Sequence, residues 1–302
     1  MMKPLVTVII PTFNRAGYVI DTLKSIAQQT YKHFECLIID DGSTDKTKEV
    51  VLSFCEKDSR FKYLTRPVDL PKGANSCRNF GVNNSKGIFI AFCDDDDFWV
   101  PEKLEIQLAV FYEKPDVFVV TGDIEYVDKN GVKINRIKSH YPHNQGCVFE
   151  KFLIKNRTSM VTPLLKKEVF EKVGIFNTHF VIAEDWEFWR RVSYYYKFYS
   201  INKVLALVRL HGENISKSRS GKPFENYKLY RKLTKSLLKW GKNRFEPTDY
   251  KLIYKMEWKT YRKLMGNHYP GILKKGAFLL KVFLGSITDG FHLIYLIMRF
   301  AR

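Results

Sequence analysis

Ile88-Phe-Ile-Ala-Phe-Cys-Asp-Asp-Asp-Asp97 is the stretch that decides the fold of this chain. Its first six residues are apolar without interruption, which predicts a strand buried on both faces of a largely parallel sheet. Aspartates follow at the carboxyl end of that strand, the edge at which open α/β sheets form a ligand crevice. In an extended chain, carboxylates two residues apart share a face, so Asp94 and Asp96 could converge on one hard cation. On this stretch alone, a solvated acidic turn leading into a helix at Pro101 is an equally good explanation.

The segments before this run have the same organisation. Three more apolar runs read as strands of one buried sheet: Leu5–Ile10, Phe34–Ile39 and Phe61–Leu64. Apolar positions at helical spacing lie between the runs or follow them: Tyr18, Leu23 and Ile26; Val50, Val51 and Phe54; Leu104, Leu108 and Phe111. This βαβ succession predicts an α/β fold.

The sheet is expected to continue beyond the aspartates. An extended run, Val117–Tyr126, is followed by the turn dipeptide Asn130-Gly131 and by residues 132–137, which predicts a hairpin. Helices are predicted over residues 167–173 and 185–196, and a strand over residues 204–210. The composition then becomes rich in Lys, Arg, Tyr and Trp, so we expect a domain boundary near Lys217 and a helical, basic remainder.

Charge and cysteine usage narrow the class of protein. The chain has 302 residues with 50 Lys plus Arg against 32 Asp plus Glu, a net charge of +18, which favours polyanions, anionic surfaces or diphosphate ligands as partners. Its five cysteines lack C-x-x-C spacing and are odd in number, which argues against a disulfide framework and a zinc ribbon. Because the first strand starts almost at the N-terminus and no signal peptide is evident, we expect a cytoplasmic protein with reduced thiols.

Two polar loops follow the first two predicted strands and should reach the same crevice as the aspartates. The first is Pro11-Thr12-Phe13-Asn14, and the second is Asp40-Asp41-Gly42-Ser43. The second loop could accept hydrogen bonds from a base or ribose, and its glycine permits close approach of the backbone. Capping of the next helix is the alternative role for Ser43, and the better explanation for Asp45.

Five segments, in this order, resemble the inverting family 2 glycosyltransferases with the GT-A fold. They are Val-Ile-Ile-Pro-Thr-Phe-Asn-Arg15, Asp40-Asp-Gly-Ser-Thr-Asp45, Gly73-Ala-Asn-Ser-Cys-Arg-Asn79, Asp94-Asp-Asp-Asp-Phe-Trp-Val-Pro101 and Glu184-Asp185. The resemblance spans most of residues 5–216. It implies a Rossmann-like mixed sheet flanked by helices, with a GT-A catalytic domain over residues 1–216. The nucleotide-binding half would cover about residues 1–100 and the acceptor half about residues 101–216.

The resemblance also implies roles for individual residues. The nucleotide, usually uridine, would lie against Pro11, Thr12, Asn14 and Asp41, and Asp41 would hold the uracil. Arg78 would approach the base or the diphosphate, although a structural salt bridge is the alternative. The metal motif of the family maps onto Asp94 and Asp96, with Mg²⁺ or Mn²⁺ as the cation, and Asp95 would contact the sugar.

Inverting sugar transfer also needs a carboxylate that takes the proton of the acceptor hydroxyl. The resemblance makes Asp185 this base and gives Glu184 a contact with the acceptor or the donor sugar, whereas helix capping is the alternative for both. His211 could complete the metal shell or bind a phosphate oxygen, or it could be a packed polar residue. Trp99, Trp186 and Trp189 could stack on a sugar or pack in the core.

The implied function is transfer of a hexose or N-acetylhexosamine from a UDP-sugar to a glycan acceptor of a capsule, a lipopolysaccharide or a lipid-linked oligosaccharide. We expect residues 217–302 to contact an anionic membrane surface at the inner face of the plasma membrane, or to form a helical subdomain that packs on the catalytic domain or on a second subunit. Nucleic-acid binding is disfavoured by the acidic crevice. A nucleotidyltransferase would need a glycine-rich basic loop after the first strand, which residues 11–16 do not provide.

Overall fold

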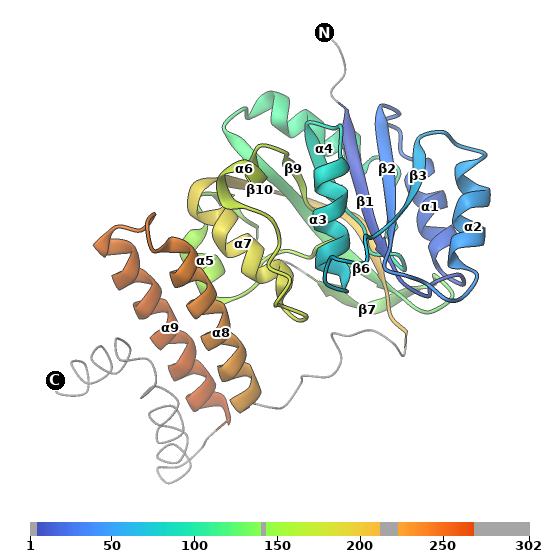
Figure 1. Ribbon diagram of the computed structural model, residues 1–302. Coiled ribbons are helices and arrows are strands. Elements are labelled where there is room, and N and C mark those ends of the chain that lie inside the picture. Colours follow the sequence, from blue (N-terminus) through green and yellow to red (C-terminus); the bar gives the residue numbers. More distant parts are fainter. Residues whose placement is uncertain (1–4, 140–142, 212–222, 269–302) are drawn as a thin grey trace, which may run out of the picture. The chain divides into compact units, whose positions relative to one another are not determined.

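The computed structural model describes residues 5–139, 143–211 and 223–268, and the chain divides into two compact units, residues 1–214 and 215–302 (Figure 1). The boundary expected near Lys217 lies outside the described residues. Residues 269–302, the last part of the helical, basic remainder expected from the sequence, also lie outside them.

A mixed sheet of ten strands forms the centre of the first unit. Eight of them have the order β3-β2-β1-β4-β9-β6-β10-β5, while β7 pairs with β6 and β8 pairs with β10. Four adjacent strands at one side are parallel: β1 (Val6–Thr12), β2 (Phe34–Asp40), β3 (Phe61–Thr65) and β4 (Phe89–Phe92). Antiparallel β9 (Leu164–Lys166) joins β4 to β6 (Val117–Val127). The far side contains β10 (Lys197–Arg209), β5 (Phe98–Trp99), β7 (Lys133–Ser139) and β8 (Gln145–Gly146). The expected mixed sheet and the hairpin of β6 and β7 are confirmed.

Helices cover both faces of this sheet, which is why its central strands are buried throughout (Figure 1). Alternate residues of β1 (Val6, Val8 and Ile10) belong to the core cluster that also contains residues of α1 (Val19–Ala27), α2 (Thr47–Cys55) and α4 (Lys103–Glu113). Ile9 points to the other face, where a Cβ on Gly81 of α3 (Ala74–Asn84) would come within 2.5 Å of it. The remaining helices are α5 (Phe149–Ile154), α6 (Val169–Val173) and α7 (Glu184–Tyr195).

Strand register brings the polar loops together. Thr12 at the end of β1 pairs with Asp40 at the end of β2, so the loops after these strands start side by side. Ile9 pairs with Phe92 of β4, and the aspartate run therefore begins at the level of Pro11. The carboxyl edge of three parallel strands thus carries all three polar segments, as the sequence predicts.

In the second unit, α8 (Pro223–Gly241) contacts α9 (Pro247–His268). Leu233, Leu237, Ile253 and Met256 are buried, and Arg231 of α8 pairs with Glu257 of α9 at 3.3 Å. No helix within the described residues combines the length and the apolar character needed to cross a membrane.

Candidate active site

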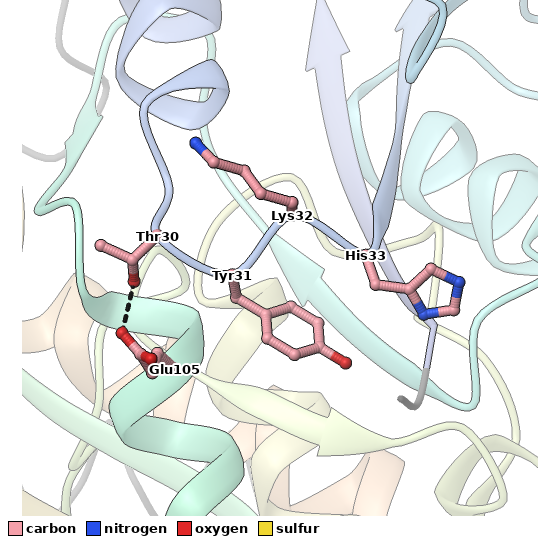
Figure 2. Close-up of a pocket in the computed structure, with 5 residues that line it drawn as sticks. All are labelled: Thr30, Tyr31, Lys32, His33 and Glu105. Carbon is pink, nitrogen blue, oxygen red and sulfur yellow. Dashed lines mark hydrogen bonds between the residues drawn. The ribbon is translucent and has the colours of Figure 1, made fainter. Parts of the chain in front are cut away.

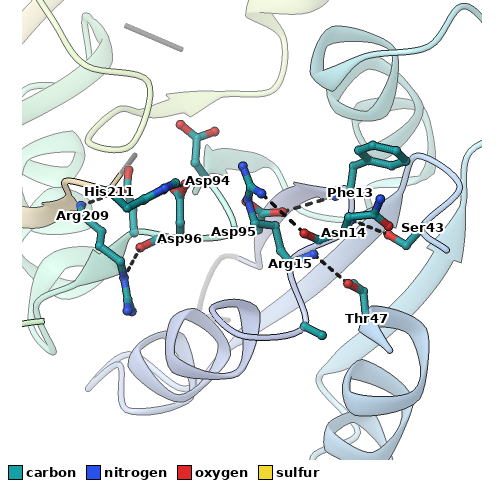
Figure 3. Close-up of polar contacts among 12 residues, drawn as sticks. Phe13, Asn14, Arg15, Ser43, Thr47, Asp94, Asp95, Asp96, Arg209 and His211 are labelled. Atoms are coloured by element: carbon teal, nitrogen blue, oxygen red, sulfur yellow. Dashed lines mark hydrogen bonds and ion pairs between the residues drawn. The ribbon is translucent and has the colours of Figure 1, made fainter. Parts of the chain in front are cut away.

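Asn14 ties the first polar loop to the second (Figure 3). Its backbone has a left-handed conformation (φ 52°), its N–H donates to the Ser43 hydroxyl at 2.9 Å, and its side-chain oxygen accepts from the Thr44 N–H at 2.8 Å. Left-handed conformations of residues other than glycine are found mainly where the surrounding structure enforces them. The side chain of Asn14 therefore shapes the crevice by holding both loops.

The two aspartates of the second loop have different partners. Asp40 accepts hydrogen bonds from the N–H groups of Gly42 (2.9 Å) and Ser43 (2.7 Å) and from the Tyr63 hydroxyl (2.6 Å), so it holds its own loop. Burial, followed by this bond to Asp40, raises the pKa of Tyr63 to about 12. Asp41 pairs with the buried Arg66 and accepts from the Gly73 N–H at 2.8 Å. Arg66 is a residue that the sequence analysis missed.

The four aspartates after β4 differ in exposure and in partners. Asp94 is the open one, with 39% of its side chain exposed, and it pairs with Arg78 at 2.8 Å. Asp95 is buried, accepts from the Phe13 N–H at 3.3 Å and lies 3.7 Å from the guanidinium of Arg15 (Figure 3). Burial and then the charge of Asp96 raise the pKa of Asp95 to about 7.

Asp96 and His211 come together across the crevice, although they are 115 positions apart in the sequence. The His211 Nε2 lies 2.8 Å from the Asp96 carboxylate, and the imidazole stacks on Tyr18 with ring centroids 5.0 Å apart. Burial and the charge of Asp94 raise the pKa of Asp96, and the bond to His211 opposes this rise. The structure thus places two of the three predicted metal ligands in direct contact.

Arg209 fixes the last part of the run and was not found from the sequence. Its backbone N–H donates to the Asp97 carboxylate at 3.0 Å, and its side-chain Nε donates to the Asp96 carbonyl oxygen at 3.0 Å. The same guanidinium donates to the Lys129 carbonyl oxygen at 2.8 Å and pairs with Asp21 at 3.1 Å. Asp97, whose pKa burial raises well above its usual range, therefore anchors the end of β10.

Arg78 links the aspartate run to the predicted base. It is buried on α3, pairs with Asp94 at 2.8 Å and lies 3.5 Å from the carboxylate of Glu184 at the start of α7. The charges of Asp94 and Glu184 raise its pKa against the effect of burial. Arg78 is thus part of an ion-pair bridge whose other members are themselves predicted site residues.

Asp185 lies next to Glu184 in the first turn of α7 and retains partial exposure. Its carboxylate accepts from the Asn156 side chain at 2.6 Å and from the Trp186 N–H at 2.7 Å. Burial, followed by the charge of Glu184, raises its pKa to about 7. A carboxylate with a pKa near the working pH has the property that a general base requires. The residue before the pair, Ala183, has a left-handed backbone (φ 59°).

The three tryptophans are core residues, which decides between the two roles considered for them. Trp99, Trp186 and Trp189 are all buried. The indole N–H of Trp99 donates to the Val161 carbonyl at 3.0 Å, and that of Trp186 donates to the Phe152 carbonyl at 2.6 Å. An exposed aromatic ring is provided instead by Phe13, 45% exposed in the first loop, with the Lys72 ammonium 5.9 Å from its centroid.

Among the described residues, no group of three or more His, Cys, Asp or Glu side chains is arranged as a set of metal ligands. Asp96 with His211, and Asp94 at the exposed side, still offer oxygen and nitrogen donors in the crevice. This set fits a divalent cation that completes its shell with substrate phosphates and water, as Mg²⁺ usually does.

A separate pocket of about 300 Å³ lies at the amino end of β2 (Figure 2). It is lined by Thr30, Tyr31, Lys32, His33 and Glu105, and the Thr30 hydroxyl donates to Glu105 at 2.7 Å. None of the predicted site residues lines it, and it opens at the end of β2 opposite to the carboxylates.

The sheet and the acidic crevice at its carboxyl edge define a glycosyltransferase of the GT-A class. The model of the family "Glycosyl transferase family 2" matches residues 7–174, so the chain belongs to this family. The family match favours the glycosyltransferase over the nucleotidyltransferase considered from the sequence.

Relatives include a protein of Rickettsia bellii named "Uncharacterized glycosyltransferase", 33% identical over 209 residues, which cover 69% of this chain and 29% of the relative. The chain thus spans about a third of the length of this protein and of its counterparts from Rickettsia felis and Rickettsia conorii. The Escherichia coli protein WfgD, named a UDP-Glc:α-D-GlcNAc-diphosphoundecaprenol β-1,3-glucosyltransferase, is 32% identical over 185 residues, which cover 61% of this chain and 68% of WfgD.

Solved structures share the fold. Staphylococcus aureus TarS 1–349 in complex with UDP-GlcNAc has a TM-score of 0.67 at 18% identity, covering 94% of this chain and 77% of that one. The mannosyltransferase PcManGT from Pyrobaculum calidifontis, in complex with GDP-Man and Mn²⁺, has a TM-score of 0.57 at 18% identity, covering 98% of this chain and 86% of that one.

Proposed function

We propose that the chain is an inverting glycosyltransferase that moves a hexose or N-acetylhexosamine from a UDP-sugar to a glycan acceptor. One observation carries this proposal: Arg78 joins Asp94, on the metal side, to Glu184, which adjoins Asp185. Leaving-group chemistry and proton transfer need separate acidic groups a short distance apart, and this bridge provides that arrangement. The names of WfgD and of the TarS complex support a UDP-linked donor.

In the proposed reaction, Asp185 takes the proton of an acceptor hydroxyl. The hydroxyl oxygen forms a bond to the anomeric carbon, the bond from that carbon to the diphosphate oxygen breaks, and UDP leaves with the electron pair. Arg78 donates hydrogen bonds to the diphosphate after giving up part of its pairing with Asp94. The uracil lies between the exposed ring of Phe13 and the loop of Asp41.

Asp94, Asp96 and His211 would hold the cation, Mg²⁺ or Mn²⁺. A bound cation at this position neutralises charge that develops on the leaving diphosphate. Asp95, buried against Arg15, lies beside this set and would accept a hydrogen bond from the donor sugar.

The test is a pair of charge-removing substitutions in purified protein, Asp185→Asn and Asp96→Ala. UDP-glucose, UDP-galactose and their N-acetyl forms serve as donors, and transfer or metal-dependent donor hydrolysis is measured. Loss of transfer by at least about 10³-fold is expected for Asp185→Asn, because an amide cannot act as a base. Asp116→Asn is the control, because it removes a carboxylate from an exposed ion pair outside the site and should leave transfer unchanged. Full transfer by either active-site variant refutes the assignment.

We further propose that the acceptor is lipid-linked and that the enzyme works at the cytoplasmic face of the plasma membrane. WfgD is named for an acceptor on undecaprenol. On α9, Lys251, Lys255 and Lys259 are exposed at intervals of four residues, whereas Ile253 and Met256 are buried. Lysines at this spacing line one side of a helix, and each cation near an anionic bilayer contributes about 1 kcal/mol. On α8, Lys228, Lys232, Lys235 and Lys239 are exposed at similar intervals.

Vesicle sedimentation tests this location. The triple variant K251Q/K255Q/K259Q should bind vesicles containing phosphatidylglycerol roughly 100-fold more weakly than the unaltered chain, with binding that decreases as salt increases. The variant K32Q/K57Q/K86Q removes the same charge from exposed positions of the first unit and should bind normally. Equal binding by both triple variants contradicts the proposed surface.

A further inference from the structure

Asn156 belongs to none of the sequence motifs described above, yet its side chain reaches the predicted base. It follows α5, and its amide nitrogen donates to one carboxylate oxygen of Asp185 at 2.6 Å. The other oxygen accepts the Trp186 N–H at 2.7 Å. With a donor on each oxygen, the plane of the carboxylate is fixed, and the remaining lone pairs stay available to an acceptor hydroxyl.

The segment that carries Asn156 is held on both sides. Before it, the carbonyl oxygens at the end of α5 accept from α7: Phe152 from the Trp186 indole at 2.6 Å, and Leu153 from the Arg190 guanidinium at 2.7 Å. Two of the residues that hold the segment therefore belong to the same helix as Asp185, so α7 positions both partners of the bond.

After it, Arg157 and Asn144 bond to each other in both directions. The Arg157 Nε donates to the Asn144 side-chain oxygen at 2.8 Å, and the Asn144 amide donates to the Arg157 carbonyl at 3.0 Å. Asn144 is itself tied to β10, because it exchanges two hydrogen bonds of 2.8 Å with Ser200. Asn156 thus lies between two anchored points and has little freedom to move away from Asp185.

The second polar atom of Asn156 has no evident structural use. Its side-chain oxygen is buried and has no hydrogen-bond partner among the residues that the structure describes. A buried polar atom without a partner is unfavourable, so a residue chosen only for packing would be apolar here. The bond to Asp185 is the interaction that explains an asparagine at this place.

We propose that Asn156 is a positioning residue for sugar transfer, which orients the carboxylate of Asp185 toward the acceptor hydroxyl and favours its ionised form. The inference rests on the proposed function of Asp185 as the base. The charged groups that face this carboxylate are Glu184, on the same helix, and Arg78 of α3. Glu184 raises the pKa of Asp185, whereas Asn156, the Trp186 N–H and Arg78 lower it.

The experiment compares Asn156→Ala and Asn156→Asp with the unaltered chain in kcat/KM for transfer as a function of pH. Asn156→Ala removes the donor, so the acid limb should move to higher pH by about one unit, and kcat/KM measured at a pH below the limb should fall about tenfold. Asn156→Asp places a second carboxylate beside Asp185, so its acid limb should move further in the same direction. At high pH most of the activity should return. UDP affinity, measured by calorimetry, should stay within about twofold, because Asn156 contacts the base and not the nucleotide loops.

The controls separate the possible failures. Asn84→Ala removes an exposed amide that bonds only to the Phe80 carbonyl of its own helix in the described structure, and it should leave the profile unchanged. If an Asn156 variant loses activity equally at every pH, or keeps the original limb, the positioning role is wrong. Should Asn156→Ala not fold, the isosteric Asn156→Asp decides. If Asp185→Asn still transfers sugar, the proposed function fails, whatever the Asn156 variants do.

Discussion

Replacing Asp185 by asparagine should stabilise the protein while it abolishes transfer. Burial and the charge of Glu184 raise the pKa of Asp185 from the ordinary 3.8 to about 7, so the folded protein disfavours the ionised carboxylate. Asparagine has the same shape without the charge, and its side-chain oxygen can still accept the Trp186 N–H. The substitution therefore removes an unfavourable buried charge from the start of α7.

The size of the gain follows from the pKa. A rise of about 3 pKa units corresponds to about 4 kcal/mol at most, since each unit is about 1.4 kcal/mol. Asp185 is partly exposed and shares its charge repulsion with Glu184, so solvent screening reduces the expected gain to about 1–2 kcal/mol. For a unit of about 200 residues, this is a rise in Tm of roughly 2–8 °C.

The gain in stability from Asp185→Asn should increase as the pH rises. Because the folded pKa lies above the unfolded one, the folded state binds more protons between them, and its stability falls as the pH rises through that window. The advantage of Asp185→Asn is therefore absent below about pH 4, grows between about pH 4 and pH 7, and is complete above about pH 7.

Urea unfolding at about pH 5 and about pH 8 measures this difference. Asp58→Asn is a control of opposite sign, because hydrogen bonds with Arg60 lower the pKa of Asp58, and losing them should destabilise the chain at both values. The reasoning is refuted if Asp185→Asn is less stable than the unaltered chain at about pH 8, or if its advantage does not increase with pH.

Three other predictions concern His211, Arg191 and Gly87, the last with a matched glycine as its control. His211→Ala should weaken the Mn²⁺-dependent binding of UDP roughly tenfold in calorimetry and leave metal-free UDP binding almost unchanged. Arg191→Met should lower the free energy of unfolding in urea by about 3–5 kcal/mol, since it leaves the carboxylate of Glu187, now 2.8 Å from Arg191, buried without its cation. Gly87→Ala should destabilise by at least about 1–3 kcal/mol, because its Cβ would lie 2.5 Å from the Thr7 backbone nitrogen, whereas the matched Gly17→Ala, with open space around it, should change stability by less than about 0.5 kcal/mol.

Strands of the sheet could be predicted from the sequence where both of their faces are buried. β1, β2 and β4 are buried at every position, so apolar runs identify them. β10 starts at Lys197, seven residues before the predicted Val204, because its first half has a single buried residue, Phe198, and contains register shifts, so it has no apolar run. The helix expected at Lys167 starts at Val169, and the one expected at Pro101 starts at Lys103.

α3 was missed for a different reason: its inward side is polar. Asn75 donates to the carbonyl oxygens of Asn177 and Phe180, and Asn79 donates to that of Phe176. These buried amides replace the apolar stripe that a helical pattern needs, and their partners lie about 100 positions away. The segment was therefore recognised by its resemblance to a family motif and not by periodicity.

The site residues also divide into those that a local sequence pattern indicates and those that only long-range contacts reveal. The aspartates after β4 could be placed because strand ends in parallel sheets share an edge. Arg209, whose bond to the Asp96 carbonyl spans 113 positions, and Asn156 have no local pattern that indicates a role. Such residues act through partners that only the tertiary fold brings near.

The basic composition and the acidic crevice are compatible because arginine and lysine occupy different places. Arg66, Arg78 and Arg209 are buried and bind carboxylates or carbonyl oxygens around the site. They offset the acidic run only in part, since the pKa values of Asp95, Asp96 and Asp97 are all raised by burial and by their neighbours' charges. The proposed divalent cation would add positive charge beside this run, and the proposed anionic surface would face the exposed lysines of α8 and α9. The net charge of +18 is therefore a property of the whole chain, and it does not describe the local charge of this acidic run.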